Sequence, residues 1–404
     1  MSENLEDLEQ WGEDVIFGRA KGFRAALMRC VLRGFSWLYR YAVLQRLRLF
    51  REGWKDQAYL GTTVISIGNI TVGGTGKTPV VELFSKTLRD RGRKVAILSR
   101  GYKSKKLDEP QEWRRKATGE IVEEDEMPKL VSAGNGLILD VQYAGDEPYM
   151  LAKNLDEVSV VVDKDRVKGG KFAIEELGSD LLLLDDGMQF LKIAHSLDIV
   201  LVDFNSPFGT GAILPRGTLR EPPKNLCRAD YIFITKCYKA GNTELIEKIR
   251  KHNAVAEIIE CTHGPQHLEN VFTGEVLPLE FLKGKYVAAI SGIAVPESFE
   301  EKLTDYGSNV LFHRTFADHH SFSQKDVDRF MRRCVRRDAD IIVTTEKDAV
   351  RFPRPAEMDV EIYFLRIEVD ILSGQDVWER LVDRVCMEKK PVDPLLLYEK
   401  SIHL

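Results

Sequence analysis

A glycine-rich stretch, GNITVGGTGKTPVVELF at residues 68–84, has the residue types needed to bind the phosphate chain of a nucleotide. Phosphate-binding loops follow the pattern G-x-x-x-x-G-K-[ST], and Gly76, Lys77 and Thr78 match its end. In such a loop the backbone N–H groups face the phosphates, the lysine reaches the β- and γ-phosphates, and the hydroxyl ligates Mg²⁺. Thr71 replaces the first glycine of the pattern. The predicted nucleotide-binding residues are Gly73, Gly74, Thr75, Gly76, Lys77 and Thr78.

Paired acids after a second apolar stretch could hold the metal that accompanies a nucleotide. Asp185 and Asp186 follow a run of leucines in SDLLLLDDGMQF, residues 179–190. They are expected at the C-terminal end of a buried strand, the edge at which open α/β sheets bind ligands. An isolated Asp-Asp-Gly is more often a turn, but beside a phosphate-binding loop a metal ligand is favoured. The guanine-binding pattern N-K-x-D does not occur in the sequence, so ATP with Mg²⁺ is predicted.

The elements around these motifs predict a mostly parallel, doubly wound sheet of the P-loop type. Residues 62–68, TTVISIG, are typical of a buried strand, and the stretch from Thr78 to Gly92 has helical periodicity. Further apolar runs alternate with helical stretches, which indicates parallel strands joined by helices. These runs lie at 94–98, 158–162, 198–204 and 230–235. A second set, at 286–291, 309–314, 340–345 and 361–366, predicts a smaller α/β unit.

Composition limits the possible classes of protein. The chain has 404 residues, 44% of them hydrophobic, and a net charge of −5, so bulk charge does not favour binding to polyanions. Its six cysteines include no C-x-x-C pair, which argues against a disulfide framework or a zinc site and fits a reducing cytosol. No apolar run reaches the roughly 18 residues of a membrane-spanning helix.

The segment from Arg19 to Arg51 contains nine Lys or Arg residues and no Asp or Glu. Its aromatic and aliphatic residues recur with helical spacing between the arginines, which predicts a long amphipathic helix. Such a helix suits an anionic membrane surface, with the apolar face in the acyl boundary and the guanidinium groups on lipid phosphates. The alternatives are a helix packed against the protein with solvated arginines and, less favoured, a nucleic-acid-binding arm.

The motifs together resemble those of the tetraacyldisaccharide 4′-kinases, from about Gly61 to Asp348. The motifs that carry the resemblance are GNITVGGTGKTP (68–79), SRGY (99–102), GDEPYMLA (145–152), LDDGMQ (184–189), LDIVLVD (197–203), LPRGTLREP (214–222), SGIAVPESF (291–299), FADHH (316–320) and TTEKDAVR (344–351). The resemblance implies an ATP- and Mg²⁺-dependent kinase that phosphorylates the 4′-hydroxyl of a tetraacylated disaccharide 1-phosphate, a lipid A precursor. It also implies a peripheral position on the cytoplasmic face of the inner membrane. The family too has a non-glycine residue at the position of Thr71.

The resemblance also implies roles for individual residues. Asp146 is the expected catalytic base, because an aspartate near the nucleophile usually accepts the proton in phosphoryl transfer. His319 is its expected hydrogen-bonding partner, with His320 as a rival, and Glu147 would support Mg²⁺. The expected contacts to the acceptor are Arg100, Tyr102 and Arg220. Arginine suits this role because its planar fork binds phosphate in a bidentate manner.

Two features depart from the family pattern or lie outside it. The family usually has a histidine after the DDG-x-Q run, and this chain has Phe190, so no role of that histidine transfers. Residues 103–128 form a charged segment expected to be a solvated loop or hairpin bordering the acceptor site.

Two other classes of protein are weighed against the kinase. A membrane-surface switch ATPase of the partitioning type would need a second lysine early in the loop, and residues 71–75 have none. A cytosolic metabolite kinase leaves the basic helix unexplained.

We therefore expect four parts in the chain. Residues 1–52 form an acidic N-terminus and the basic helix, 53–265 a P-loop kinase domain, 266–370 a smaller α/β domain, and 371–404 a C-terminal helical segment and tail. In this division Asp146 and the FADHH motif belong to different domains. The predicted partners are a glycolipid and an anionic membrane, not a nucleic acid, and the sequence sets neither the oligomeric state nor the acyl chains accepted.

Overall fold

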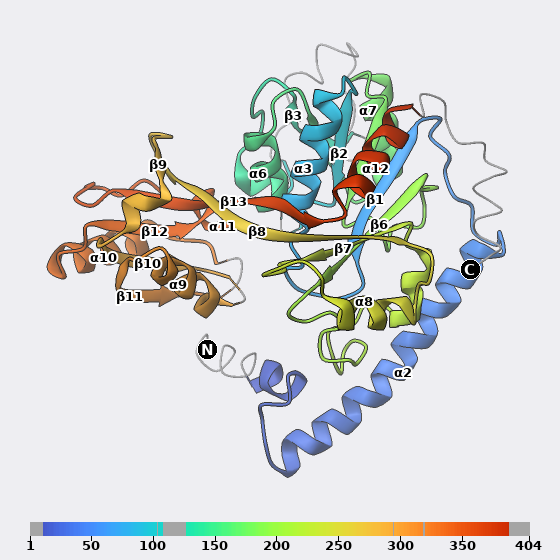
Figure 1. Ribbon diagram of the computed structural model, residues 1–404, viewed down its shortest axis with the longest axis horizontal. Helices are drawn as coiled ribbons and strands as arrows, with labels where there is room; N and C mark the ends of the chain where they lie inside the picture. The colour runs from blue at the N-terminus through green and yellow to red at the C-terminus, as the bar shows by residue number, and fades with distance from the viewer. Residues whose placement is uncertain (1–10, 103, 108–126, 294, 318–319, 388–404) are drawn as a thin grey trace. The chain divides into compact units, whose positions relative to one another are not determined.

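The computed structural model describes residues 11–102, 104–107, 127–293, 295–317 and 320–387 (Figure 1). The chain folds into two compact units, and each is built from separate stretches of sequence. Unit 1 contains residues 1–98, 165–262 and 371–404, and unit 2 contains residues 99–164 and 263–370. The sequence analysis placed 99–164 with the P-loop domain, whereas the structure groups this stretch with 263–370.

The core of unit 1 is a parallel sheet with the strand order β2-β5-β1-β6-β7-β8. Its strands are β1 (Thr63–Asn69), β2 (Val95–Ser99), β5 (Leu181–Asp185), β6 (Leu197–Asp203), β7 (Tyr231–Thr235) and the first part of β8 (Glu257–Asn270). β1, β2, β5 and β7 are buried along their whole length, as expected for parallel strands covered on both faces. The predicted doubly wound α/β fold is thus confirmed, with β1 in the centre.

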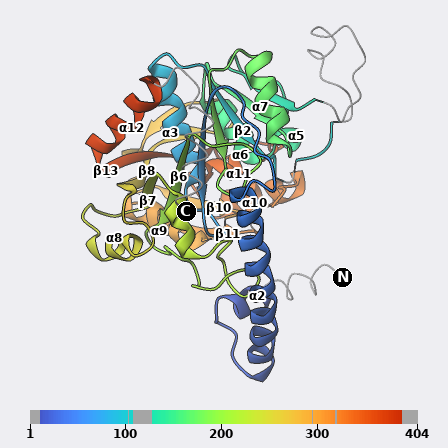
Figure 2. The same ribbon diagram turned by 90° about the vertical axis from the view of Figure 1, so that its right-hand side faces the viewer.

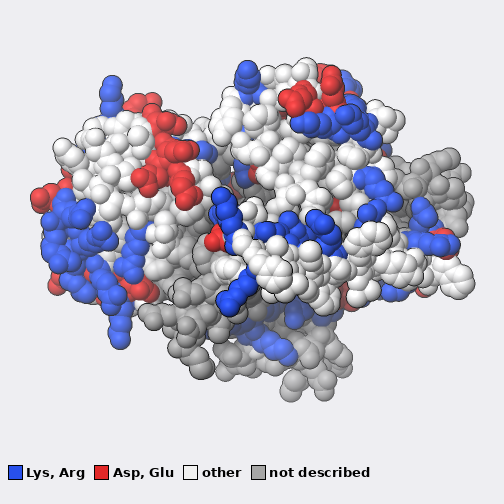
Figure 3. Space-filling model, turned by 90° about the horizontal axis from the view of Figure 1, so that it is seen from below, with Lys and Arg blue, Asp and Glu red and all other residues white. Residues whose placement is uncertain are grey.

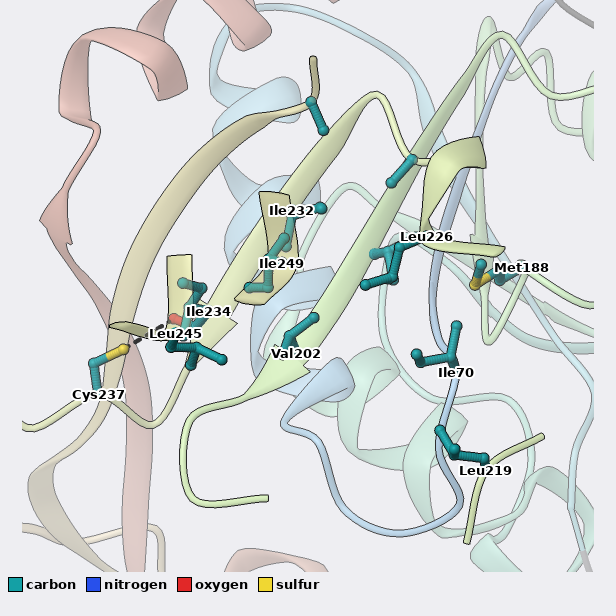
Figure 4. Close-up of a cluster of buried hydrophobic side chains, with 13 residues drawn as sticks. Ile70, Met188, Val202, Leu219, Leu226, Ile232, Ile234, Cys237, Leu245 and Ile249 are labelled. Carbon is teal, nitrogen blue, oxygen red and sulfur yellow. Dashed lines mark hydrogen bonds between the residues drawn. The ribbon is translucent and has the colours of Figure 1, made fainter. Parts of the chain in front are cut away.

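Helices cover both faces of this sheet. They are α3 (Lys77–Asp90), α7 (Arg166–Glu175), α8 (Thr243–Arg250), α12 (Gln375–Met387) and the 3-10 turn η1 (Pro223–Arg228). Side chains of a strand point alternately to opposite faces, so Ile232 and Ile234 of β7 pack with Leu245 and Ile249 of α8 (Figure 4). Phe233 points the other way, where Trp378 of α12 lies with ring centroids 6.0 Å apart.

Helix α2 (Phe23–Arg51) precedes the sheet of unit 1 and extends from it (Figure 2). The helix was expected from Arg19, but it begins four residues later because Gly22 has a φ of 100°, which is outside the helical range. Ser36, on its buried side, donates a hydrogen bond to the Ile213 carbonyl at 2.8 Å and accepts one from the Arg216 N–H at 3.0 Å. Among the described residues, no helix combines the length and apolar character needed to cross a membrane.

Unit 2 contains the predicted second α/β arrangement. Parallel strands in the order β11-β10-β12-β13 form its sheet: β10 (Tyr286–Ser291), β11 (Asn309–Thr315), β12 (Ile341–Thr345) and β13 (Ile362–Ser373). The helices of this part are α9 (Pro296–Asp305), α10 (Gln324–Arg336), the short α11 (Glu346–Ala349) and the 3-10 turn η2 (Leu279–Leu282). Alternate residues of β10 face opposite sides, so that Ala289 packs with Phe299 of α9 and Ile290 with Phe330 of α10.

The stretch 99–164 adds smaller elements to unit 2. They are β3 (Lys129–Ala133), β4 (Ser159–Val162), α5 (Val141–Ala144) and α6 (Asp146–Asn154), with β3 and β4 antiparallel. The second part of β8 also lies in this unit and pairs in antiparallel fashion with β9 (Val276–Pro278). The chain passes between the units within β8 and within β13.

Candidate active site

The loop between β1 and α3 has a backbone that its glycines make possible. Gly73 and Gly76 have φ values of 114° and 78°, which side-chain-bearing residues rarely adopt, and Gly76 directly precedes α3. Thr71 is not among the residues with positive φ, and its hydroxyl accepts a hydrogen bond from Asn69 Nδ2 at 3.3 Å. The departure from the glycine pattern therefore brings no backbone strain.

The lysine of the loop is held from two sides. Asn69, buried at the end of β1, donates to Thr75 Oγ1 at 3.0 Å and accepts from Lys77 Nζ at 3.4 Å. Lys77 Nζ also lies 3.5 Å from Asp186 Oδ1. Lys236, which follows β7, donates to the Gly74 carbonyl and is paired with Asp203 at 2.6 Å.

Asp186 lies at the centre of a cluster of cations. Arg220 Nη1 contacts both of its carboxylate oxygens, at 2.9 and 2.7 Å, and Arg166 donates to its main-chain carbonyl at 2.9 Å. Burial alone would raise the pKa of Asp186, but the charges of Lys77 and Arg220 outweigh it and hold the pKa below its usual value. Asp186 also has a positive φ of 54°, whereas Asp185, the last residue of β5, is buried.

Arg220 was predicted from the sequence as a contact to the acceptor, and the structure places it on Asp186. Next to it, Gln189 donates to both the Asn69 carbonyl and Glu221 Oε1 at 3.0 Å. Buried Glu221 is in turn held by Arg228, at 2.7 and 2.8 Å. Gln189 and Glu221 belong to the LDDGMQ and LPRGTLREP motifs, but spacing in sequence gave no sign that they meet.

The aromatic residue that replaces the family's usual histidine has a specific contact. The guanidinium carbon of Arg166 lies 5.1 Å from the centroid of the Phe190 ring, which is a cation–π arrangement. The Phe190 carbonyl forms a hydrogen bond with His195 Nε2 at 3.1 Å, and the other ring nitrogen of His195 forms a hydrogen bond with Asp198 at 2.9 Å. The ring at position 190 thus covers one face of the same arginine that binds the Asp186 backbone.

The oxygen atoms available in unit 1 suit Mg²⁺. Thr78 in the first turn of α3 offers a hydroxyl, and Asp185 and Asp186 offer carboxylates, which are hard ligands of the kind that Mg²⁺ prefers. Within the described parts of the chain, no group of three or more His, Cys, Asp or Glu side chains could hold a metal. This donor set fits Mg²⁺ in particular, because in nucleotide sites that ion takes one or two protein ligands together with substrate phosphates and water.

Two turns of unit 2 that carry predicted acceptor residues pack against each other. Gly101, between Arg100 and Tyr102, has a φ of 67°, and a Cβ atom there would lie 3.4 Å from the Ala144 carbonyl oxygen. Gly145 has a φ of 90°, and a Cβ atom there would lie 3.2 Å from the Tyr102 carbonyl oxygen. The SRGY turn therefore lies directly beside the start of α6, and both Arg100 and Tyr102 are exposed.

Asp146 and Glu147 form the first turn of α6. The Asp146 carboxylate lies 3.6 Å from Arg351 Nε, which also belongs to unit 2. The expectation that Asp146 and FADHH belong to different domains is wrong, because residues 99–164 and 263–370 fold together. His319 lies outside the described residues, as does most of the charged segment 103–128. The ring of His320 stacks on Phe316 at 4.4 Å, with Nε2 3.8 Å from Asp326.

Comparison with known proteins decides the family. A family model described as tetraacyldisaccharide-1-P 4′-kinase matches residues 28–386. The chain belongs to this family. Its relatives include the tetraacyldisaccharide 4′-kinases of Anaeromyxobacter dehalogenans strain 2CP-C, 36% identical over 84% of this chain and 86% of the relative, and of Halothermothrix orenii, 32% identical over 84% and 88%. LpxK from Aquifex aeolicus, solved in complex with ATP, is similar in structure, with a TM-score of 0.68 and 29% sequence identity. The similarity covers 89% of this chain and 99% of the LpxK chain.

Membership of the tetraacyldisaccharide 4′-kinase family confirms three of the sequence predictions: the family resemblance, the kinase class of enzyme and ATP as the nucleotide. The partitioning-type ATPase and the cytosolic metabolite kinase are no longer needed to explain the loop. Proteins of this family are ATP-dependent and use Mg²⁺, in agreement with the oxygen donors of unit 1. The roles of individual residues and the membrane contact stay predictions.

Proposed function

We propose that this chain transfers the γ-phosphoryl group of ATP to the 4′-hydroxyl of a tetraacylated disaccharide 1-phosphate, the lipid A precursor. Family membership over residues 28–386 supports the reaction. The observation in the structure that carries it is the cation pair at Asp186, which follows β5: Lys77 Nζ lies 3.5 Å and Arg220 Nη1 2.7 Å from oxygen atoms of its carboxylate. Phosphoryl transfer depends mainly on such positioned charges, because the transferring group itself needs little covalent help.

Unit 1 is assigned the binding of ATP. The backbone of residues 73–78 would surround the phosphates, and Lys77 would lie against the β- and γ-phosphates. The Lys77 side chain is only 13% exposed, so its charge acts where water screens it weakly. Thr78 together with Asp185 or Asp186 would hold Mg²⁺, which would neutralise part of the charge of the phosphates. Arg220 fixes Asp186 and thereby the position of that carboxylate.

Unit 2 is assigned the activation of the acceptor. Asp146 is the proposed base that takes the proton of the sugar hydroxyl, and His319 is its proposed partner. Asp146 lies in the first turn of α6, where the positive end of the helix dipole attracts a negative charge. Glu147 is proposed to support Mg²⁺, and the adjacent Arg100 and Tyr102 to contact the acceptor.

Helix α2 is the proposed contact with an anionic membrane. Its buried side is fixed to residues 213–216 through Ser36, while large apolar side chains on the rest of its surface are exposed. These exposed residues are Phe23, Leu27, Met28, Val31, Phe35, Trp37, Leu38 and Tyr41. Figure 3 shows the molecule from below, the side toward which α2 extends in Figure 1, and Lys and Arg side chains lie there among uncharged residues. A helix of this composition binds in the plane of the interface, which suits a peripheral enzyme on the cytoplasmic face of the inner membrane.

The proposed reaction is tested with γ-labelled ATP and purified tetraacyldisaccharide 1-phosphate in detergent micelles. We expect label to appear on the 4′-oxygen of the disaccharide. Hydrolysis of ATP that is stimulated by anionic vesicles, with no labelled lipid, would instead support a membrane-surface ATPase. Transfer to a water-soluble sugar with equal efficiency would show that the acyl chains play no part in recognition.

A further inference from the structure

A buried guanidinium group in unit 2 contacts both stretches that carry the proposed acceptor-activating residues. Arg351 follows α11, and its side chain is 8% exposed. Its Nη2 donates to Asp348 Oδ1 at 2.6 Å, and its Nη1 donates to the His320 carbonyl at 2.8 Å. Its Nε lies 3.6 Å from Asp146 Oδ1. One planar group therefore joins α6, α11 and the stretch that precedes α10.

Asp348 holds this guanidinium in place. Its side chain is fully buried, and its second oxygen, Oδ2, accepts from the Gly292 N–H at 2.8 Å and from the Thr345 hydroxyl at 2.7 Å. Thr345 also accepts from the Asp348 N–H at 3.2 Å, which fixes the start of α11. A buried carboxylate is tolerated only when it is paired and hydrogen-bonded in this way, and such a network has one stable arrangement.

The backbone on both sides of residues 318 and 319 is packed against the same network. A Cβ atom at Gly292 would lie 3.1 Å from the Ala317 carbonyl and 3.2 Å from Asp348 Oδ1, so only glycine allows this approach without adjustment. The His320 N–H donates a hydrogen bond to the Ala317 carbonyl at 3.1 Å. The centroid of the Phe322 ring lies 5.9 Å from the Arg351 guanidinium carbon. Ala317 and His320, the described residues on either side, are thus both fixed to this part of unit 2.

We propose that Arg351 is a positioning residue for the kinase reaction, one that sets the Asp146 carboxylate and the His320 backbone in a fixed mutual arrangement. The inference rests on the proposed role of Asp146 as the base. Arginine suits the task because its rigid fork reaches several partners at set angles, whereas lysine presents a single point charge. Asp348 fixes the fork through its contact with Nη2.

The distances agree with orientation rather than with proton transfer by Arg351. At 3.6 Å the contact to Asp146 is an ion pair and not a hydrogen bond of ordinary length. A nearby cation of this kind attracts the carboxylate and keeps it pointing in one direction. Proton transfer needs a group that gains or loses a proton near neutral pH, and arginine does neither.

The test compares Arg351→Met, which removes the charge and keeps much of the volume, with Arg351→Lys and Arg351→Ala. For Arg351→Met we expect kcat to fall about 100-fold, the loss typical of a misplaced reacting group, with the ATP dissociation constant unchanged. Arg351→Lys should recover only part of the rate, because it cannot hold Asp146 and the His320 carbonyl together. Methylguanidinium added to Arg351→Ala should raise kcat, which it would not do if the residue only held the fold together.

A matched control is available in the same unit. Arg366 is buried to a similar degree and is paired with Glu346 of α11. Arg366→Met should lower the thermal midpoint about as much as Arg351→Met while retaining kcat. Equal kcat losses in the two variants would overturn the positioning role and leave a structural one.

A double mutant separates this inference from the function on which it rests. If Asp146→Asn is strongly impaired, adding Arg351→Met should cost little more, because residues that act as a unit are non-additive. A fully multiplicative loss would overturn the role of Arg351 alone. Normal turnover of Asp146→Asn would instead refute Asp146 as the base, and the positioning role with it.

Discussion

A single residue, Asp186, gathers the cations of the nucleotide site. Lys77 from the loop and Arg220 from the stretch after β6 contact its carboxylate, and Arg166 at the start of α7 donates to its main-chain carbonyl. Placing three cations within reach of one another is costly unless an anion lies among them, because like charges in a partly buried place repel. The residue therefore organises the site as well as serving as a proposed metal ligand.

At this scale the sharpest prediction concerns Lys77. Lys77→Ala removes the charge aimed at the transferring phosphates, and we expect kcat to fall about 100-fold or more. Steady-state kinetics with saturating ATP and acceptor measure it. Lys86→Ala, an exposed lysine on the same helix, is the control and should keep its turnover. Turnover near that of wild type in Lys77→Ala would refute the assignment of the loop.

The sequence predicts some residues of this site and not others for a physical reason. Lys77, Asp185 and Asp186 were predicted because a short motif specifies both the residue and its place at a strand end. Arg220 was assigned to the acceptor, and its contact with Asp186 depends on a path of chain between β6 and η1 that no local pattern specifies. Phe190 was recognised only as a departure from the family's usual histidine. Its contact with Arg166 could not be predicted, because Arg166 lies in a stretch that contains no motif.

Individual elements depend on contacts far along the chain, and Glu260 in β8 is an example. Its buried carboxylate accepts hydrogen bonds from the N–H groups of Gly241 and Asn242, at 2.8 and 2.9 Å, and from the Ser373 hydroxyl in β13. Burial alone would raise the pKa of Glu260, but these hydrogen bonds outweigh it and lower the pKa below its ordinary value of 4.5. The turn before α8 and the end of β13 are thus joined to one strand.

This arrangement predicts a pH dependence of stability. A carboxylate whose pKa is lower in the folded state contributes stability that is complete above its ordinary pKa and is lost as the pH falls through the lowered value. We expect Glu260→Gln to cost about 1–3 kcal/mol of unfolding free energy at pH 7 and to flatten the loss of stability below about pH 4.5. Urea unfolding across a pH series measures both effects.

The control lies on the same strand. Glu257 forms an exposed ion pair with Arg380 at 2.7 Å, and exposed pairs contribute little to stability. The unfolding free energy of Glu257→Gln should therefore depend on pH as that of the wild type does. If the unfolding free energies of Glu260→Gln and the wild type differ by the same amount at every pH, the hydrogen bonds of Glu260 do not favour its charged form.

Helix α12 makes a second prediction at the scale of elements. Trp378 is buried against Phe84 of α3 and Phe233 of β7, with ring centroids 5.3 and 6.0 Å away. Trp378→Ala should lower the unfolding free energy by about 3–5 kcal/mol, as expected when a buried aromatic leaves a cavity. Exposed Trp54 supplies the control, since Trp54→Ala should change stability little. Equal effects of the two substitutions would mean that α12 does not cover the sheet.

Elements were predicted well where burial on both faces produces a continuous apolar run. The strand predicted at 286–291 agrees with β10 for this reason, because all of its residues but Tyr286 are buried. The strand predicted at 309–314 nearly agrees with β11, although β11 is an edge strand that is only partly buried. β8 was not predicted, because Gly264 and Pro265 lie within it and both residues weaken the strand pattern. β13 was expected to end at residue 366 but continues to Ser373, where apolar and polar residues alternate instead of forming a run.

At the scale of the whole molecule, membrane binding should have two separable parts. Replacing Phe35, Trp37 and Leu38 with serine removes apolar area, and we expect a loss of vesicle binding that persists at high salt. Replacing Arg24 and Arg40 with glutamate should weaken binding mainly at low salt, by up to about 1 kcal/mol for each basic residue lost. Co-sedimentation with anionic vesicles over a salt series measures both.

The matched control is the basic face of α10 in unit 2. Arg332 and Arg336 are exposed there, and their replacement with glutamate should leave vesicle binding unchanged if α2 is the membrane contact. Kinetics in detergent should be normal for all of these variants. If the α2 variants sediment like wild type, the helix serves the fold alone; if the α10 variant is the one released, the contact lies in unit 2.

The way the chain is divided between its units has a consequence for synthesis on the ribosome. Residues 99–164 emerge well before 263–370, the stretch with which they fold, and unit 1 waits for α12 to cover Phe84 and Phe233. Neither unit can complete its core when its first segment leaves the exit tunnel, in contrast to domains that fold in the order of their translation. Nascent chains should therefore expose apolar strands until almost the whole sequence has been made, and should depend on chaperones during that interval.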